Sequence, residues 1–371
     1  MPNGMFVKKV IKKALVAGAD SGTLTIDLPR ANYLASLMVR GKNTNGSTSN
    51  TAETLESVVT KIEVEADGVV IFSMTGYLAR LFEHFDIGKL PAYDESQSAN
   101  AVQFAEFPIK FGRHQSDKEI ILPAHRFASL QLKITYACTD SATVGWATSE
   151  SNLKFDVVAS YLVSKELINT PFFKKINVFS HTTTAVTDDE VDLPTGAGAG
   201  AYRRIMIGAY EAGIQDGVDC TEYELLVNGS QRVVHDLWDT SQDEDYQRYK
   251  ARGGKQFIAY LSAATTTVTF KVSRINQVAV TGATDDKTFT YDSIAGDQVV
   301  FDTESSSASD GSVKVEGNGV SYATMIDLGT DNINDSLDVT AGSGISSLKL
   351  KLVTGAAGAD NRVVTEQLVK F

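Results

Sequence analysis

Cysteine and proline are scarce in this chain. Its 371 residues include two cysteines, Cys138 and Cys220, and seven prolines. Two cysteines cannot build the disulfide framework of a small secreted domain, so we expect free thiols in a reducing compartment. In such a compartment we expect no glycan on the Asn-x-Ser sites at Asn45, Asn228 and Asn334.

Long apolar runs and an excess of positive charge are also missing. No apolar stretch approaches the roughly 18 residues of a membrane-spanning helix. The first residues interleave lysines with apolar side chains, so we expect no signal peptide. A net charge of -12 argues against a protein that coats nucleic acid with its whole surface. With 43% hydrophobic and 22% charged residues, the chain is typical of a globular protein and is long enough for two cores.

Recognisable catalytic and phosphate-binding motifs are missing as well. The glycine-rich segment 195–202 (TGAGAGAY) does not have the G-x-G-x-x-G spacing, and Gly254-Lys255 lacks the Ser or Thr of a P-loop. No G-x-S-x-G elbow occurs. The acidic runs 188–190 and 243–245 lack the alternating oxygen ligands of a calcium loop, so we interpret them as solvated acidic faces. We therefore expect no enzyme activity and no cofactor.

The histidines offer one weak candidate for a metal site. None of the five histidines forms an H-x-x-x-H or similar close pair. His114, Asp117 and His125 could converge across a hairpin, and imidazole with carboxylate is a common zinc-binding set. Surface polar residues are the favoured interpretation, so we predict no metal.

Three blocks of the sequence occur twice, in the same order and far apart. The first copies are Ile26–Pro29 with Tyr33–Gly41, Glu63–Gly68 and Ser129–Thr135, and the second copies are Val191–Pro194 with Tyr202–Ala209, Glu224–Gly229 and Ser347–Val353. One such match means little, but three in a single order are hard to obtain by chance. We therefore predict two copies of one β-rich domain.

The second copy is longer than the first. The stretch between the second and third blocks spans 61 residues in the first copy and 118 in the second, a surplus of 57. A further match, FPIKFG (107–112) with TMIDLG (324–329), confines the surplus to residues 254–319 or thereabouts. Long insertions are tolerated where they meet only water, so we predict a β-rich insert that projects from the outer surface.

Strand and helix signals occur in the same order in both copies. Most of the chain alternates apolar and polar residues at period two, as in LKLKL (348–352), which is typical of strands with one buried face. Asp67-Gly68 and Asn228-Gly229 mark tight turns. Helical spacing follows each turn, over Tyr77–Phe85 in the first copy and Arg232–Lys250 in the second. Each copy is therefore predicted to contain strands, a turn, one helix and more strands.

This order resembles that of a family of viral proteins. The segments that show the resemblance are IEVEADGVVIFSMTGYLARLF (62–82), FFKKI (172–176), DLP (192–194) and YELLVNGSQRVVHDLW (223–238). Two tandem eight-stranded jelly rolls, each with a helix after an Asp/Asn-Gly hairpin, are similar to the double jelly-roll major capsid proteins of tailless icosahedral viruses. Among these, the compact capsid proteins of corticovirus-like and finnlakevirus-like bacteriophages, which usually enclose a membrane, are the most similar. The resemblance covers nearly all of the chain except the insert.

The resemblance implies an all-β fold with a structural function. The expected parts are an N-terminal basic amphipathic helix (1–18), a first jelly roll (19–166) and a second jelly roll (167–371) that contains the insert. In such capsid proteins three chains form a pseudo-hexameric capsomer, so a homotrimer is expected to tile an icosahedral shell. The implied partners are further copies of the chain, penton and minor capsid proteins, and an internal membrane; the host receptor stays unknown. The protein would be made in the host cytoplasm and located in the virion.

The segment Met5–Val16 has a distinctive charge pattern. On a helical wheel, Val7, Val10, Ile11, Ala14 and Leu15 fall on one side, and no acidic residue precedes Asp20. We predict a basic amphipathic helix that faces a membrane or the capsid interior through Lys8, Lys9, Lys12, Lys13, Val10 and Ile11. A helix packed against its own or a neighbouring roll, with solvated lysines, is an equally favoured alternative.

Two other classes of function are weighed against a capsid role. A secreted or surface β-sandwich protein for binding or adhesion would be expected to have a secretion signal and clustered exposed aromatic residues. This chain has only Trp146 and Trp238 as tryptophans, and Trp238 falls in a helical pattern. An enzyme of the cupin type would need two or three histidines with a carboxylate on facing strands, and the sequence lacks this set.

Overall fold

The computed structural model describes most of the chain. The described residues are 4–47, 50, 53–94, 99–141, 145–148, 152–184, 186–210, 218–249, 253–261, 266–269, 272–282, 287–292, 298–303, 309–320, 322–329 and 336–370. Between residues 250 and 321 the description is confined to the backbone. The chain divides into two compact units, unit 1 with Met1–Asp86, Pro91–Ile176 and Leu368–Phe371, and unit 2 with Ile87–Leu90 and Asn177–Gln367.

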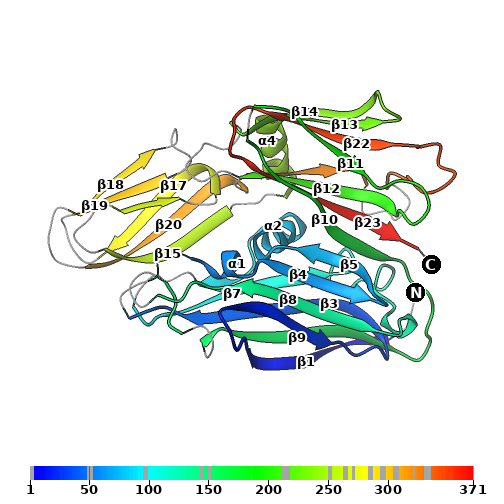
Figure 1. The fold of residues 1–371 in the computed structure, drawn as a ribbon, viewed down its shortest axis with the longest axis horizontal. Helices are drawn as coiled ribbons and strands as arrows, with labels where there is room; N and C mark the ends of the chain where they lie inside the picture. Colours follow the sequence, from blue (N-terminus) through cyan, green and yellow to red (C-terminus); the bar gives the residue numbers. More distant parts are fainter. Residues whose placement is uncertain are drawn as a thin grey trace. The chain divides into compact units, whose positions relative to one another are not determined.

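Unit 1 contains a jelly roll with two sheets (Figure 1). One sheet has the strand order β1-β9-β3-β7-β6 and the other has β2-β8-β4-β5. The strands are β1 (Gly4–Val16), β2 (Ser21–Asp27), β3 (Tyr33–Thr44), β4 (Lys61–Ala66), β5 (Val69–Met74), β6 (Tyr93–Asp94), β7 (Val102–Lys110), β8 (Leu130–Ala137) and β9 (Lys154–Ser164). The connections include the helices α1 (Leu55–Val58) and α2 (Gly76–Ile87) and the 3-10 turn η1 (Ala124–Arg126).

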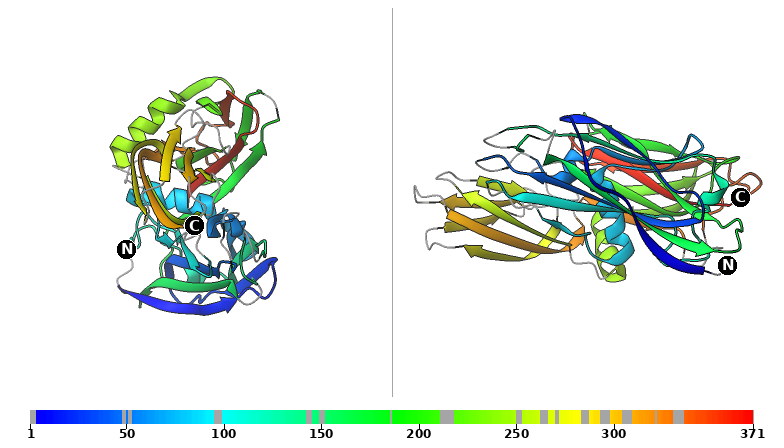
Figure 2. Two further views of the ribbon diagram at one scale, coloured as in Figure 1. Left: turned by 90° about the vertical axis from the view of Figure 1, so that its left-hand side faces the viewer. Right: turned by 90° about the horizontal axis from the view of Figure 1, so that it is seen from below.

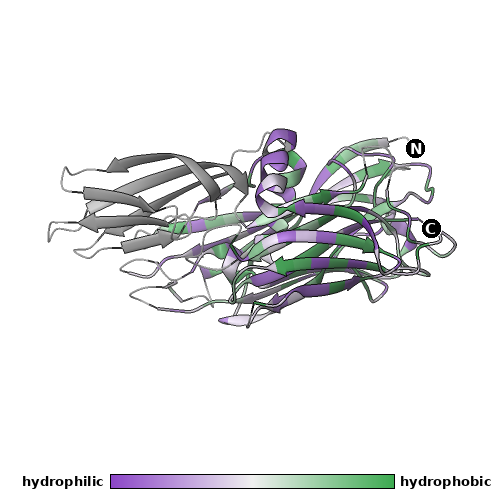
Figure 3. Ribbon diagram, turned by 90° about the horizontal axis from the view of Figure 1, so that it is seen from above, coloured by the Kyte–Doolittle hydropathy of each residue, from purple (hydrophilic) through white to green (hydrophobic). Residues whose placement is uncertain are grey.

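Alternating side chains bury one face of each sheet. In β8, Leu130, Leu132 and Ile134 are buried, whereas the residues between them are half-buried. The two inner faces meet in a shared core, where Tyr136 of β8 and Phe155 of β9 have ring centroids 6.1 Å apart. Figure 3 shows hydrophobic and hydrophilic residues alternating along the strands.

Unit 2 contains the second jelly roll. One sheet has the order β11-β22-β13-β14, and the other contains β10, β23, β12 and β21 as successive neighbours. The elements are β10 (Phe172–Thr182), β11 (Asp189–Leu193), β12 (Ala201–Tyr210), β13 (Cys220–Val227), β14 (Gln231–Leu237), α4 (Trp238–Tyr249), β21 (Ala323–Asp327), β22 (Leu348–Thr354) and β23 (Asp360–Val369). One hydrophobic cluster joins both sheets, with Val191, Leu225 and Leu350 from the first and Ile205, Ile207 and Val363 from the second.

The strand β10 passes from one unit to the other. In unit 1, Lys175 and Ile176 pair in parallel with Phe72 and Ser73 of β5. The later residues of β10 belong to unit 2. The boundary between the compact units therefore falls at 176 and 177, within a strand. The boundary between the two rolls at 166 and 167 stays a prediction.

The internal repeat is visible in single hydrogen bonds. Asp67 and Asn228 have φ values of 51°, and the glycines that follow them, Gly68 and Gly229, have φ values of 78° and 86°. These left-handed residues form the β4-β5 and β13-β14 hairpins. The Asp67 N–H donates to the Ser129 carbonyl oxygen at 3.1 Å, and the Asn228 N–H donates to the Ser347 carbonyl oxygen at 3.0 Å. The predicted equivalence of the two turns is confirmed.

The insert forms strands, as predicted from its sequence. Its backbone contains β15 (Gly253–Leu261), β16 (Thr266–Thr269), β17 (Val272–Gly282), β18 (Lys287–Asp292), β19 (Gln298–Thr303) and β20 (Ser309–Val320). They form two three-stranded sheets, β15-β20-β17 and β16-β19-β18, whose strands are yellow to orange in Figure 2. Gly253 pairs with Gly317, so the two ends of the insert lie on neighbouring strands.

The prediction of an N-terminal helix was wrong. Residues 4–16 form the strand β1, which pairs antiparallel with β9 from Gly4 opposite Ser164 to Val16 opposite Lys154. The pairing of β1 with β9 shifts register after Val10 and after Lys12. These shifts allow lysines that are spaced almost as on one face of a helix to lie along a strand. β-Branched Val7, Val10 and Ile11 favour the extended form, and pairing with β9 stabilises it.

The second predicted helix begins later than expected. Arg232–Lys250 was predicted as one helix, but residues 231–237 form β14, and α4 begins at Trp238. Val233, Val234 and Leu237 match helical spacing, but the hairpin turn at Gly229 pairs this segment with β13. The first predicted helix, Tyr77–Phe85, is confirmed within α2.

Candidate functional site

The predicted histidine and aspartate candidates do not form a metal site. The Asp117 carboxylate is bound by the Arg113 guanidinium at 2.7 and 3.0 Å and accepts from the N–H groups of Glu119 and Ile120. These donors keep the pKa of Asp117 below its usual value although burial opposes them. His125 packs edge-on against Tyr33, with ring centroids 5.0 Å apart. Asp117 therefore organises a loop, and His125 covers a buried tyrosine.

A different group of possible ligand atoms lies on the β13-β14 hairpin. Oxygens of Glu222 and Glu224 and a ring nitrogen of His235 lie within 4.8 Å of one another. The Arg232 guanidinium donates to Glu224 at 2.6 Å, and His235 contacts Glu222. Cationic or polar side chains of the same hairpin thus already satisfy these carboxylates, so the arrangement is a partly buried ion-pair cluster.

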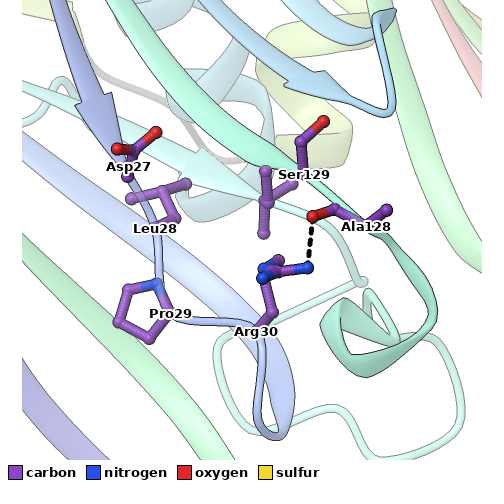
Figure 4. A pocket seen from close by; sticks show the side chains of 7 residues that line it. Asp27, Leu28, Pro29, Arg30, Ala128 and Ser129 are labelled. Carbon is purple, nitrogen blue, oxygen red and sulfur yellow. Dashed lines mark hydrogen bonds between the residues drawn. The ribbon is translucent and has the colours of Figure 1, made fainter.

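A hollow of about 580 Å³ lies beside the first repeated block (Figure 4). It is lined by Asp27, Leu28, Pro29, Arg30, Ala128, Ser129 and Leu130. The Arg30 guanidinium donates to the carbonyl oxygens of Phe127 and Ala128, and Gln131 donates to Asp27 at 2.9 Å. These hydrogen bonds join β2 and the loop after it to β8 and the loop before it, which is a structural role.

Buried ion pairs fix the start of β10 in unit 1. Lys110 lies 2.7 Å from Glu83 and 3.8 Å from Asp86, and Lys175 lies 3.5 Å from Asp86. The Lys175 ammonium is also 4.5 Å from the centroid of the Phe82 ring. All four ionic side chains are almost completely buried. Desolvation raises the pKa of Glu83, while Lys110 opposes that rise. This network anchors β10 against α2.

Two sheet edges of the rolls carry exposed apolar side chains. On β1, Met5 is 68% exposed and Val10 is 60% exposed; on β14, Val233 is 45% exposed and Leu237 is 54% exposed. In the strand orders of the described residues, β1 has β9 as its one neighbour and β14 has β13. Unpaired strand edges of this kind can bind another strand.

The predicted interior-facing residues all lie on the β1 edge. Lys8, Lys9, Lys12 and Lys13 are exposed, whereas Ile11 is half-buried. The structure therefore brings the four lysines together along an open sheet edge and not on one face of a helix. The apolar helix face that suggested a membrane contact does not exist, because residues 4–16 form a strand. Phe6 of this strand packs against the cluster of Tyr33, Ala35, Ile121 and Leu162. A membrane- or interior-facing role for the lysines stays a prediction.

Solved structures of capsid proteins have the same fold. The major capsid protein of STIV (Sulfolobus Turreted Icosahedral Virus) is 12% identical with a TM-score of 0.61, and the match covers 98% of this chain and 96% of that one. The major capsid protein of bacteriophage PM2 is 11% identical with a TM-score of 0.54, covering 99% and 98%. A chain of the PBCV-1 virus capsid is 9% identical with a TM-score of 0.53, covering 99% and 94%. The chain thus has the double jelly-roll fold of these capsid proteins.

Comparison of the amino-acid sequence alone does not assign the chain to a protein family. No protein-family model matches the chain, and no curated protein matches it. In the part of the chain that the structure describes, no helix is long and apolar enough to cross a membrane.

Proposed function

We propose that this protein is a viral major capsid protein with a structural and non-enzymatic role. The observation that supports this function best is the double jelly roll, which matches known capsid proteins over 98–99% of this chain. Chance similarity of single β-sandwich domains would not extend across two rolls in tandem. The buried polar clusters described above are occupied by ion pairs and hydrogen bonds that hold loops and strands, which is consistent with a structural protein.

Three copies of the chain form the proposed capsomer. Two similar rolls in one chain present similar sides, so six rolls from three chains approximate a hexagon and can contact six neighbours in similar ways. Such capsomers would tile an icosahedral shell in the virion. Penton and minor capsid proteins would complete the shell at positions that a hexagonal unit cannot fill.

The insert is proposed to lie on the outside of the shell. Its ends lie on the paired strands β15 and β20, so its sheets form an appendage that does not interrupt the core strands of the roll. An outer appendage could bind a host receptor or stabilise the capsomer. The lysines Lys8, Lys12 and Lys13 of β1 are proposed to face the shell interior or an internal membrane.

The test is the assembly state of the purified protein. Light scattering should give a mass of three chains, and negative-stain microscopy should show pseudo-hexagonal particles. Limited proteolysis of whole particles should cut within 254–319 and spare 4–16. A folded protein that stays monomeric at every concentration and salt would refute the capsid function, whereas cleavage of 4–16 with protection of 254–319 would reverse the proposed orientation.

A further inference from the structure

The edge strands β1 and β14 correspond, in the internal repeat, to β10 and β5. These two corresponding strands pair with each other. β1 is the first strand of its roll, next to β9, and β10 occupies the same place next to β23. β14 follows the Asn228-Gly229 turn as β5 follows the Asp67-Gly68 turn. β5 and β10 are hydrogen-bonded in parallel, so the chain itself contains one example of the contact that β14 and β1 lack among the described residues.

The repeat can be aligned residue by residue. FVKKV (6–10) matches FFKKI (172–176), so Lys9 corresponds to Lys175. In the same alignment Ala17 corresponds to Thr183. The Ala17 N–H donates to the Leu153 carbonyl oxygen at the end of β1, and the Thr183 N–H donates to the Ala359 carbonyl oxygen at the end of β10.

The other pair of strands aligns through its hairpin ladders. Val64 pairs with Phe72, and Leu225 pairs with Val234 at the corresponding place, so Phe72 corresponds to Val234. Ser73 then corresponds to His235.

Burial differs between the paired and the unpaired copies. Ile71 on β5 is 4% exposed, whereas its counterpart Val233 on β14 is 45% exposed. Lys175 on β10 is 2% exposed, whereas Lys9 on β1 is exposed. Exposed valines on a strand edge lose the hydrophobic stabilisation that their counterparts have, and a second strand would restore it.

Charge supports the same pairing. The segment 4–16 contains four lysines and no acidic residue, and α4, which follows β14, has exposed Asp239, Asp243 and Glu244. In unit 1 the Lys175 ammonium lies over Phe82 of α2. With the same alignment, Phe82 corresponds to Glu244 of α4. In a contact between β1 and β14 like that between β10 and β5, the Lys9 ammonium would therefore lie beside the Glu244 carboxylate.

We propose that β1 of one copy binds in parallel to β14 of a second copy, with Lys9 opposite Val234, Val10 opposite His235, and the Lys9 ammonium paired with Glu244. This proposal rests on the capsid function and names the contact between chains. Because the two edges differ, the contact is head-to-tail and closes when three chains complete a ring of six rolls. Added strands of this kind gain affinity from main-chain hydrogen bonds and specificity from side chains.

Disulfide trapping tests the register. Val10→Cys combined with His235→Cys places two thiols on directly opposite residues of strands about 4.8 Å apart, within the Cα range that a disulfide requires. Oxidised protein should give covalent dimers and trimers on non-reducing gels. Met5→Cys with His235→Cys is the control, because five residues along a strand displace the thiol by about 16 Å. Equal cross-linking in both variants, or in the parent protein through Cys138 and Cys220, would refute the register.

Charge reversal tests the ion pair in the same protein. Lys9→Glu or Glu244→Lys alone should weaken trimer formation about tenfold or more, and the two together should restore it. Lys13→Glu makes the same charge change outside the proposed pair and should have a smaller effect. Loss of binding to phosphatidylglycerol vesicles with unchanged assembly in Lys9→Glu would assign this edge to a membrane and refute the proposal.

The outcomes separate this contact from the capsid function. Trimers and shells that form without the cross-link and without charge rescue would refute the contact and leave the capsid function intact. A folded protein that forms no oligomer under any condition would refute both.

Discussion

Asp245 is expected to make the second roll less stable as the pH rises. Its side chain is 8% exposed on α4, and burial raises its pKa to about 7. One carboxylate oxygen accepts from the Thr324 hydroxyl at 2.9 Å and from the Met325 N–H at 3.0 Å. Arg248 lowers this pKa and Asp327 raises it, but both effects are smaller than desolvation. Below about pH 7 the folded protein therefore holds Asp245 mainly in its protonated form.

The sign and the size of the effect follow from linkage. An aspartate in the unfolded chain has a pKa near 3.8, so between about pH 4 and 7 the folded state binds more protons than the unfolded state. Stability then falls as the pH rises through this window and levels off above it. A rise of about three pKa units corresponds to at most about 4 kcal/mol, at roughly 1.4 kcal/mol per unit.

Asp245→Asn should remove this dependence on pH. The amide oxygen can accept both hydrogen bonds, and the amide does not ionise, so the variant should match the parent protein at pH 4 and exceed its stability by up to about 4 kcal/mol at pH 8. Urea unfolding followed by fluorescence of Trp238, which is buried at the start of the same helix, measures the difference. Asp245→Ala is the control, because it leaves the Thr324 and Met325 donors unpaired and should destabilise the roll at every pH. Parallel pH profiles for Asp245→Asn and the parent protein would refute the reasoning.

Three further perturbations test the fold. Gly68→Ala and Gly229→Ala should each cost about 1 kcal/mol in thermal melts, because both turns require a left-handed residue; strongly unequal losses would contradict the repeat. Leu350→Ala in the core of the second roll should cost about 2–5 kcal/mol in urea unfolding, whereas Lys351→Ala on the other face of that strand should cost less than about 1 kcal/mol. Replacing 254–319 with a short Gly-Ser linker should leave the circular dichroism of the rolls and trimer formation intact, and an unfolded product would show that the insert is part of the core.

The sequence predicted the duplicated fold because the repeated residues fix turns and ladder positions. The Asp67-Gly68 and Asn228-Gly229 turns need left-handed φ values, and few residues other than Gly, Asn and Asp adopt them. The repeated Leu and Lys alternation of β8 and β22 appears unchanged as buried and half-buried positions. These features depend on local geometry, so they can be recognised without knowledge of the whole structure.

The N-terminal strand was missed because the spacing of its lysines fits both a helix and an irregular strand. Lysine pairs separated by two apolar residues fit one face of a helix, and the irregularities of β1 allow the same spacing in a strand. The match of FVKKV with FFKKI would have settled the choice, because a segment that repeats a strand of the second roll is expected to form the same strand in the first. Long-range pairing with β9, 142 residues away between Ala14 and Asp156, is outside what local periodicity can predict.

The divergence of the two rolls suggests how a duplicated chain avoids unlimited association. In unit 1 the β5-β10 contact is made within the chain and is buried with the Lys175 and Asp86 ion pair. β1 and β14 correspond to β10 and β5 but have no such contact among the described residues. β1 carries lysines, and α4, which follows β14, carries acidic residues. Two β1 edges, or two β14 edges, would therefore bring like charges together. Only a β1 edge and a β14 edge are complementary, and each chain has one of each. In the proposed ring of three chains every β1 edge would pair with a β14 edge, so neither would be left to extend a filament.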